Sequence, residues 1–336
     1  MSELVSVIIT TCNGTRKLVR AIESVLNQTY KNLEVLVIDD NGKNTSGQLQ
    51  TEEMISDYTK TGKIKYIAHD VNKNGAAARN TGVRNAAGTY LAFLDDDDFF
   101  LPERVERFVD VIEKEEADMI YSAVLFVKNK SIVSIMSANE DGFSYQDLLE
   151  NQSLLGTGSN IFVKRNIYLK INGFDESFFR YQDVEFMIRA LRVGKIKGIN
   201  ECLVAKDITD VRFYPKYEKF LMAQKMFFEK FAQDINELTP SRKRNALYIK
   251  RTELYYSACL SKEKNNINDA YMLLENDIPG LTGKEQLKIK LRGLYMRYLY
   301  KTFGILRNIK QIVKSKKIEE SCTNEFKMKL RKAIEV

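Results

Sequence analysis

The sequence has very little histidine, and His69 is the only one among its 336 residues. A single histidine excludes a metal site built from several histidines and argues against a Ser-His-Asp triad. The apolar run at residues 64–68 predicts a strand directly before His69. We therefore expect His69 to be a strand-end residue rather than a catalyst.

Cysteines and long apolar runs are scarce as well. The four cysteines are Cys12, Cys202, Cys259 and Cys322. They lie too far apart in the sequence for a metal-type pair or a disulfide framework, which is typical of a reducing cytoplasm. No run approaches the ~18–20 apolar residues of a membrane span. Because the N-terminus leads directly into a strand pattern, we expect no signal peptide. We expect a cytoplasmic protein that lies, at most, at the inner face of the membrane.

Positive charge is concentrated in one place. The formal net charge is +7. Residues 284–317 hold eleven Lys/Arg and one acid, Glu285, a local charge of +10, which leaves −3 for the remainder. The basic excess therefore belongs to one C-terminal segment, where apolar residues recur at helical spacing.

Short apolar runs alternate with helical patterns in the first third of the chain. Strands are predicted at 5–10, 34–40, 64–68 and 89–94, and helices at 18–26, around 54–58 and at 75–87. This order predicts an α/β protein with a mainly parallel sheet flanked by helices on both faces. Right-handed crossovers would place the strand ends along one edge.

The pattern changes further along the chain. Residues 117–205 look mixed, with strands predicted at 119–127 and 159–163, a turn at 173–176 and a helix at 183–193. Beyond Pro215 only helical patterns remain. We place a boundary near 210–218, which gives an α/β domain over 1–212 and a C-terminal all-helical domain over 213–336.

Four adjacent acids, Asp95 to Asp98, follow the predicted strand at 89–94. Adjacent carboxylates repel one another and raise each other's pKa values unless something compensates their charge. Oxygen ligands suit Mg²⁺ or Mn²⁺, which then bridge to substrate phosphates. Ligands of open α/β sheets bind at this carboxyl edge of the strands. The alternative is a solvated acidic turn before the helix that follows Pro102.

Polar residues end the other strands too, and small residues surround one arginine. Thr10, Thr11 and Asn13 end the first strand, and Asp39 and Asp40 end the second. The segment from Asn74 to Gly82 places Arg79 near a helix start, which favours a phosphate. Together these residues suit a nucleoside diphosphate. Taken singly, small residues often serve close packing and strand-end acids often cap a helix.

The arrangement resembles the GT-A glycosyltransferases of family 2, over residues 5 to about 205. Val5–Asn13 resembles the first strand of that family, Ala21–Tyr30 its "S-x-L-x-Q-T" helix and Glu34–Asp40 its "E-x-x-V-x-D-D" strand. Asn74–Gly82 is similar to "N-x-G…A-R-N-x-G", and Phe93–Asp98 to "F-L-D-x-D-D". Asn172–Glu176 is similar to "G-G-F-D-E", and Tyr181–Phe186 to "E-D-x-D".

The resemblance implies roles for individual residues. Asp40 would bind uracil, Asp97 would be the main metal ligand for Mn²⁺ or Mg²⁺, and Asp183 would be the catalytic base. Asp95 or Asp96 would reach the ribose, or the metal through water. The other residues implied to bind the UDP-sugar are Thr10, Thr11, Asn13, Asn74 and Arg79.

The same resemblance implies an inverting hexosyl- or N-acetylhexosaminyltransferase, because one base and one displacement invert the anomeric centre. Asp183 has an alternative role as the N-cap of its helix. Gln182 stands where the family usually has glutamate. Gly156 to Ser159 are either part of the acceptor floor or a plain loop. Arg212 and Tyr214 are candidates to close over the donor.

Several alternatives concern partners. The acceptor would be a glycan on lipid or protein, as in bacterial surface polysaccharide synthesis. The basic C-terminal helices could pack on the domain, form a homo-oligomer or lie on an anionic membrane surface, whereas no module for nucleic acid accompanies the charge. A non-catalytic assembly subunit with the same fold is the second hypothesis. A nucleotidyltransferase is the third, although the chain lacks a glycine- and lysine-rich phosphate loop near its start.

Overall fold

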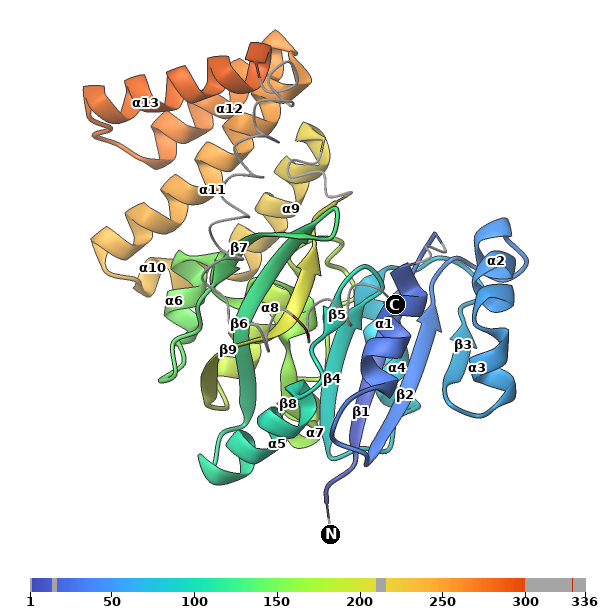
Figure 1. Ribbon diagram of the computed structural model, residues 1–336. Coiled ribbons are helices and arrows are strands. Elements are labelled where there is room, and N and C mark those ends of the chain that lie inside the picture. The colour runs from blue at the N-terminus through green and yellow to red at the C-terminus, as the bar shows by residue number, and fades with distance from the viewer. Residues whose placement is uncertain (1, 14–16, 210–215, 300–327, 329–336) are drawn as a thin grey trace. The chain divides into compact units, whose positions relative to one another are not determined.

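The computed structural model describes residues 2–13, 17–209, 216–299 and 328 (Figure 1). The described chain forms two compact units, one made of residues 2–145 and 153–209 and the other of residues 146–152 and 216–299. The boundary predicted at 212/213 lies within 210–215, outside the described residues. The residues that position the candidate site all belong to the first unit.

The first unit is built on a nine-stranded sheet. Its parallel part has the order β3 (Lys65–Ala68), β2 (Leu33–Asp39), β1 (Val5–Thr11) and β4 (Tyr90–Asp95). Beyond β4 the sheet is mixed, because β8 (Phe162–Lys164) is antiparallel to its neighbours β4 and β6. The remaining strands are β5 (Phe99–Phe100), β6 (Met119–Lys128), β7 (Ser131–Met136) and β9 (Ile196–Asp207).

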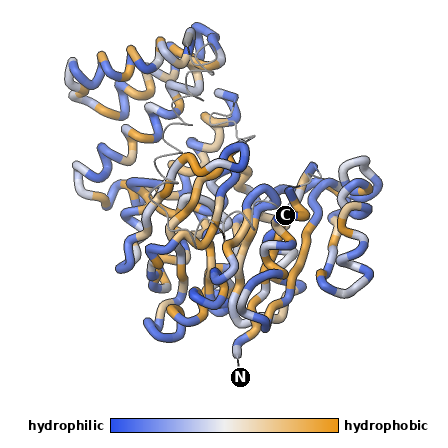
Figure 2. The backbone as a smooth tube through the Cα atoms, viewed as in Figure 1, coloured by the Kyte–Doolittle hydropathy of each residue, from blue (hydrophilic) through white to orange (hydrophobic). Residues whose placement is uncertain are grey.

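Alternation along β1 assigns its two faces. Val5, Val7 and Ile9 share one core cluster with the buried side of α1 (Lys17–Leu26) and with α5 (Arg104–Lys114). Ile8 points to the other face, against Gly82 of α4 (Gly75–Arg84). Successive side chains of a strand point to opposite faces, so helices cover both sides of the sheet as predicted. Figure 2 shows the hydrophobic residues gathered along these central strands.

The α4 face also carries α8 (Gln182–Leu191). Phe93 of β4 makes edge-on contacts with Phe174 and Phe186, at ring-centroid distances of 5.1 and 6.3 Å. Phe174 and Phe186 stack on each other at 4.2 Å. This aromatic cluster fixes α8 beneath β4, with the start of the helix near the strand-end edge.

Several predicted boundaries differ from the structure. The helix expected around 54–58 is two short helices, α2 (Ser46–Met54) and α3 (Ser56–Lys60), which meet at Ile55. The helix expected to reach residue 87 ends at Arg84. The strand expected at 159–163 begins only at Phe162, since residues 158–160 form a 3₁₀ turn capped by Thr157 and followed by β8 and α7 (Arg165–Lys170).

The second unit is helical over residues 216–299, as the sequence predicts. Its helices are α9 (Tyr217–Lys230), α10 (Ala232–Glu237), α11 (Pro240–Ser261), α12 (Lys264–Asp277) and α13 (Gly283–Leu294), which a π-turn continues over Tyr295–Leu299. Arg242 of α11 pairs with Asp147 and Glu150 on α6 (Tyr145–Glu150), which belongs largely to this unit. Within the described ranges, no helix has the length and apolar character needed to cross a membrane.

Candidate active site

The candidate site lies where β1, β2 and β4 end. In the parallel register Thr10 stands opposite Asp95 of β4, and Thr11 stands opposite Asp39 of β2. Asp40 directly follows β2, and its main-chain N–H donates to the Thr11 carbonyl at 2.9 Å. The prediction that these strand ends lie along one edge is therefore confirmed.

A buried network holds Asp40 in place. Its Oδ1 accepts from His69 Nδ1 at 2.7 Å and from the Lys73 N–H at 2.8 Å. Its Oδ2 accepts from Asn72 at 3.1 Å. His69 Nε2 lies 2.8 Å from Thr81 Oγ1 on α4. His69 directly follows β3 and is buried, which confirms it as a strand-end residue that orients an acid.

The neighbouring Asp39 is buried and accepts hydrogen bonds that hold the loop after β2. Its Oδ2 accepts from the Tyr66 hydroxyl at 2.8 Å, and its Oδ1 accepts from the Asn41 main-chain N–H at 2.8 Å. The Asn41 side chain in turn accepts from the exposed Asn13 N–H at 2.6 Å. Asn13 therefore belongs to the β1 loop at this edge, and its contact with a nucleotide stays a prediction.

Helix α4 presents its residues in three directions. Asn74 is its N-cap and accepts from the Ala77 N–H at 3.0 Å. Asn80 points away from the strand ends, where its Oδ1 accepts from the Phe174 N–H at 2.9 Å and its Nδ2 donates to the Phe174 carbonyl at 2.9 Å. Gly82 faces Ile8, where an added Cβ would lie 2.3 Å from Ile8 Cγ2.

Arg79 of α4 is a buried cation at the strand-end edge. Its guanidinium forms a 2.5 Å ion pair with Asp95 and donates to the Gln182 amide oxygen at 3.0 Å. It also lies 5.4 Å from the ring centroid of Phe174. Only one of its two side-chain partners at this edge, Asp95, carries a charge.

The acids after β4 differ in their surroundings. Asp96 accepts from the Thr11 hydroxyl at 2.6 Å, and burial, with the repulsion of its acidic neighbours, raises its pKa to about 7. Burial followed by repulsion from Asp95 raises the pKa of Asp97 to about 6. Burial also raises the pKa of Asp98 to about 7, even though Thr157 and Ser159 donate to it at 2.8 and 2.7 Å.

These residues fit a hard divalent cation. Burial, with repulsion between the acids, raises the pKa values of Asp96 and Asp97, so a cation at this edge would favour their charged forms. Asp95 and Asp97 offer carboxylate oxygens, the ligands that Mg²⁺ and Mn²⁺ prefer. In the described part of the chain, no group of three or more His, Cys, Asp or Glu residues is placed to hold a metal. A cation here would therefore draw its remaining ligands from a substrate and water.

Asp183 lies in the first turn of α8. The helix cap is Tyr181, in a left-handed conformation with φ 62°, so the alternative of Asp183 as the N-cap is wrong. Its Oδ1 accepts from the N–H of the next residue, Val184, at 3.0 Å. A Cβ placed on Gly158 would lie 3.5 Å from Arg79 Nη2 and 3.5 Å from Asp183 Cβ. The space that a side chain at position 158 would fill is therefore bordered by both the cation and the candidate base.

The contacts of the loop at 156–159 were the part of the site that the sequence predicted least. The hydroxyl of Ser159 donates to Asp98 and also accepts from the Asp95 N–H at 3.0 Å. The loop is thereby tied to the acidic run, and whether it also forms an acceptor floor stays a prediction. Lys17 and Arg20 at the start of α1 pair with Asp207, and Arg20 also donates to the Asp97 carbonyl at 2.8 Å, a long-range arrangement without a sequence signal. Arg212 and Tyr214 lie outside the described residues.

Comparison with known proteins gives one family. The profile described as "Glycosyl transferase family 2" matches residues 6–200. The amylovoran biosynthesis glycosyltransferase AmsB of Erwinia amylovora is 30% identical over 56% of this chain and 64% of that protein. The Escherichia coli UDP-Glc:alpha-D-GlcNAc-diphosphoundecaprenol beta-1,3-glucosyltransferase WfgD is 29% identical over 59% of this chain and 73% of that protein.

The chain spans less than two thirds of the length of some of these relatives: 64% of AmsB and 28% of an uncharacterized glycosyltransferase of Rickettsia bellii. Among solved structures, TarS of S. aureus matches with a TM-score of 0.56 and 17% identity, over 88% of this chain and 52% of that chain. Its fragment 1-349 in complex with UDP-GlcNAc matches with a TM-score of 0.54 and 16% identity, over 81% of this chain and 90% of that chain. These likenesses confirm the predicted GT-A fold.

Proposed function

This chain belongs to glycosyl transferase family 2, and we propose that it moves a hexosyl or N-acetylhexosaminyl group from a UDP-sugar to a hydroxyl of a glycan acceptor. One observation carries the proposal: Arg79, paired with Asp95 at the carboxyl edge of the sheet, and Asp183 both border the space that a side chain at Gly158 would fill. A cation for a diphosphate and a base for an acceptor hydroxyl thus stand next to each other.

The donor would lie along the strand ends. Thr10, Thr11 and Asn13 would line the nucleotide pocket, and Asp40 would contact the uracil. The network around Asp40 supports its part, because His69 and Asn72 hold the carboxylate in one orientation before any ligand arrives. A carboxylate that is already held in its binding orientation loses little side-chain entropy when a ligand binds. Asn74 supports the site indirectly as the cap of α4, and Asp95 or Asp96 would reach the ribose.

The diphosphate would lie at Arg79. The guanidinium already keeps one charged partner, Asp95, and a phosphate would be a stronger, bidentate one. Asp97, with Asp95, would hold Mn²⁺ or Mg²⁺, which would neutralise the charge of the departing UDP. The raised pKa of Asp97 supports this, because a carboxylate in that position gains from a nearby cation.

Asp183 would act as the catalytic base. Its carboxylate takes the proton of the acceptor hydroxyl while that oxygen bonds to the anomeric carbon. The bond from the anomeric carbon to the UDP oxygen breaks, and its electron pair leaves with the diphosphate. A single displacement inverts the anomeric centre. We propose a bacterial surface glycan on lipid or protein as the acceptor class. The names of two relatives support it, since AmsB is named for amylovoran biosynthesis and WfgD for transfer to alpha-D-GlcNAc-diphosphoundecaprenol.

The test is UDP release from a panel of UDP-sugars with a pooled glycan acceptor. We expect one donor to turn over, and Asp183→Asn to lower kcat at least a hundredfold while UDP binding is kept, because the amide cannot take a proton. Asp110→Asn, on the exposed side of α5, is the matched control and should behave as wild type.

Either of two results would contradict the proposal. If Asp183→Asn keeps full transfer, the base is another residue. If every donor is inert and UDP does not raise the melting temperature, the chain is a non-catalytic subunit that keeps the fold. The stereochemistry of the product, read by NMR, tests inversion separately.

A further inference from the structure

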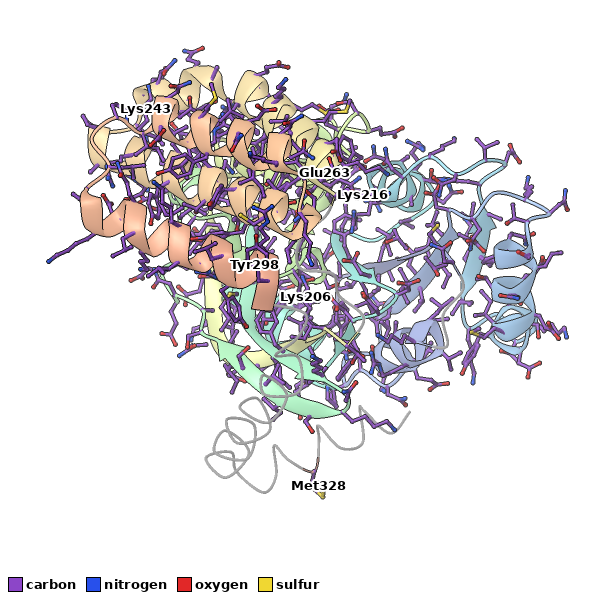
Figure 3. All side chains as sticks on the ribbon, turned by 90° about the horizontal axis from the view of Figure 1, so that it is seen from above. Lys206, Lys216, Lys243, Glu263, Tyr298 and Met328 are labelled. Atoms are coloured by element: carbon purple, nitrogen blue, oxygen red, sulfur yellow. The ribbon has the colours of Figure 1, made fainter. Side chains whose placement is uncertain are left out.

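An apolar stripe lies on the outer face of α13, in the helical unit. Leu287, Leu291 and Leu294 recur at spacings of four and three residues, which places them on one face of a helix. Their exposed fractions are 59%, 57% and 53%. Tyr298, labelled at the end of the same helix in Figure 3, continues the series with 57% exposure.

The opposite face of this helix is already used for packing. Ile289, Gly293 and Met296 are buried. A Cβ on Gly293 would lie 2.6 Å from the ring of Tyr255, so α13 approaches α11 closely at this point. The exposed leucines are therefore not the residues that hold α13 on its own unit.

The charges around the stripe have one sign. Lys284, Lys288 and Lys290 are exposed on α13 beside the leucines. The one acid of the helix, Glu285, is engaged in the capping box with Thr282 and accepts from Arg244 at 2.9 and 3.0 Å. The outer face thus joins leucines to lysines, and one of these, Lys290, also lies 5.0 Å from the ring centroid of Tyr271.

We propose that this face of α13 binds the surface of an anionic lipid bilayer, with the helix in the plane of the interface and the three leucines inserted. Charge complementarity selects this occupant. A second copy of the chain would bring lysines against lysines, and a nucleic-acid backbone offers no apolar phase for the leucines. At the headgroup boundary of a bilayer, the apolar face of a basic amphipathic helix contacts the acyl chains and its basic face contacts the anionic headgroups.

The basic character of α13 continues along the sequence that follows it. The segment 284–317 has a charge of +10, from eleven Lys/Arg and Glu285. Basic residues close to an anionic membrane each strengthen binding by about fivefold, and salt screens the effect. The attachment would be peripheral, since no described helix is long and apolar enough to span a bilayer.

The experiment is flotation of the full chain with vesicles of phosphatidylglycerol and phosphatidylcholine in equal parts, compared with phosphatidylcholine alone. We expect binding to the anionic vesicles only, weakened by high salt. Lys284→Glu/Lys288→Glu should lower the partition coefficient by roughly 25-fold or more. Leu287→Ser/Leu291→Ser should lower it by roughly ten- to fiftyfold.

Matched controls lie on other helices of the same unit. Lys219→Glu/Lys225→Glu on α9 reverses the same number of exposed charges. Met222→Ser/Met272→Ser on α9 and α12 removes side chains that are 58% and 59% exposed. Both controls should float with anionic vesicles as wild type does, and all variants should release UDP from the donor at the wild-type rate without vesicles, which separates this proposal from the proposed catalytic function.

Three results would overturn the proposal. The first is a wild type without any preference for anionic vesicles. The second is a leucine variant that binds them fully but turns a dimer into a monomer in light scattering, which would assign the stripe to a second copy. The third is a leucine variant that binds fully but melts several degrees lower, which would assign the stripe to packing within the chain.

Discussion

At the scale of single residues, the site depends on which partners each polar group already has. Gln182 shows this clearly. Its amide oxygen accepts from Arg79 at 3.0 Å, and its amide nitrogen donates to the Phe178 carbonyl at 2.6 Å. A glutamate, the residue that resemblance to the family leads one to expect, has no donor for that carbonyl. This chain has therefore tied the loop before α8 to residue 182 by a bond that only the amide can make.

We predict that Gln182→Glu weakens the site although it keeps the side-chain shape. The new oxygen would face the Phe178 carbonyl, and two acceptors at that distance repel, at a cost of about 1–3 kcal/mol. The added charge would also occupy Arg79. The free energy of unfolding in urea should fall by about that amount, and kcat/KM for the donor should fall roughly tenfold. Gln50→Glu, exposed on α2, is the control, and an unchanged kcat/KM in Gln182→Glu would refute the argument.

At the scale of elements, α4 links the core to the site. Arg79, Asn80 and Gly82 occupy one turn of the helix and face three targets: the acidic edge, the loop at Phe174 and strand β1. The helix can come this close to β1 because Gly82 has no side chain. The position of Arg79 at the edge therefore depends on a packing contact about a turn away.

We predict that Gly82→Ala lowers both stability and activity. The new Cβ would lie 2.3 Å from Ile8 Cγ2, so α4 has to shift away from β1. Overpacking of this kind costs about 1–3 kcal/mol. Thermal unfolding and kcat should both show the loss. Gly283→Ala in α13, where an added Cβ meets nothing within 4 Å, is the control and should be neutral or slightly stabilising. A wild-type melting temperature and kcat for Gly82→Ala would show that α4 and Ile8 accommodate the added methyl group without cost.

The elements also show how far sequence alone reaches. Strands β1, β2 and β4 were predictable as short, nearly continuous apolar runs, and helix α1 was predictable because its apolar residues recur at helical spacing. The strand expected at 159–163 was not. There the Asn160 side chain bonds the Ser122 main chain at 3.0 and 2.8 Å and holds a 3₁₀ turn in place of extended backbone. Such a bond joins residues 38 positions apart, and neither segment carries a local signal for it.

The same limit applies to the site. The strand ends and the segment around Arg79 predicted that Arg79 and Asp95 share one edge, and the resemblance to the family added Asp183; the structure brings the three together. It could not show that Thr157 and Ser159 donate to Asp98, which lies 59 and 61 positions away and is buried from solvent. The roles of Asp97 as a metal ligand and of Asp183 as a base stay predictions, because they concern species that bind to the protein.

At the scale of the whole molecule, ligand binding should appear as a gain in stability. A ligand at a hundred times its Kd adds about 2.7 kcal/mol to the free energy of unfolding. Without a substrate, the protein offers the cation few ligands. Asp95 is already paired with Arg79, and Asp97 is the other carboxylate that we propose as a metal ligand. We therefore predict that Mn²⁺ alone raises the melting temperature little and that UDP and Mn²⁺ together raise it more than the sum of their separate effects.

The synergy follows from shared ligands, because the diphosphate completes the coordination that two carboxylates begin. Asp97→Ala should abolish the synergy while UDP alone still stabilises through Arg79, and Asp110→Asn should keep it. Differential scanning fluorimetry with Mn²⁺, Mg²⁺ and a chelator measures all of these terms. An equal shift by Mn²⁺ with and without UDP would mean that the protein holds the cation by itself. The carboxylates at the edge of the sheet would then bind the metal without ligands from the diphosphate.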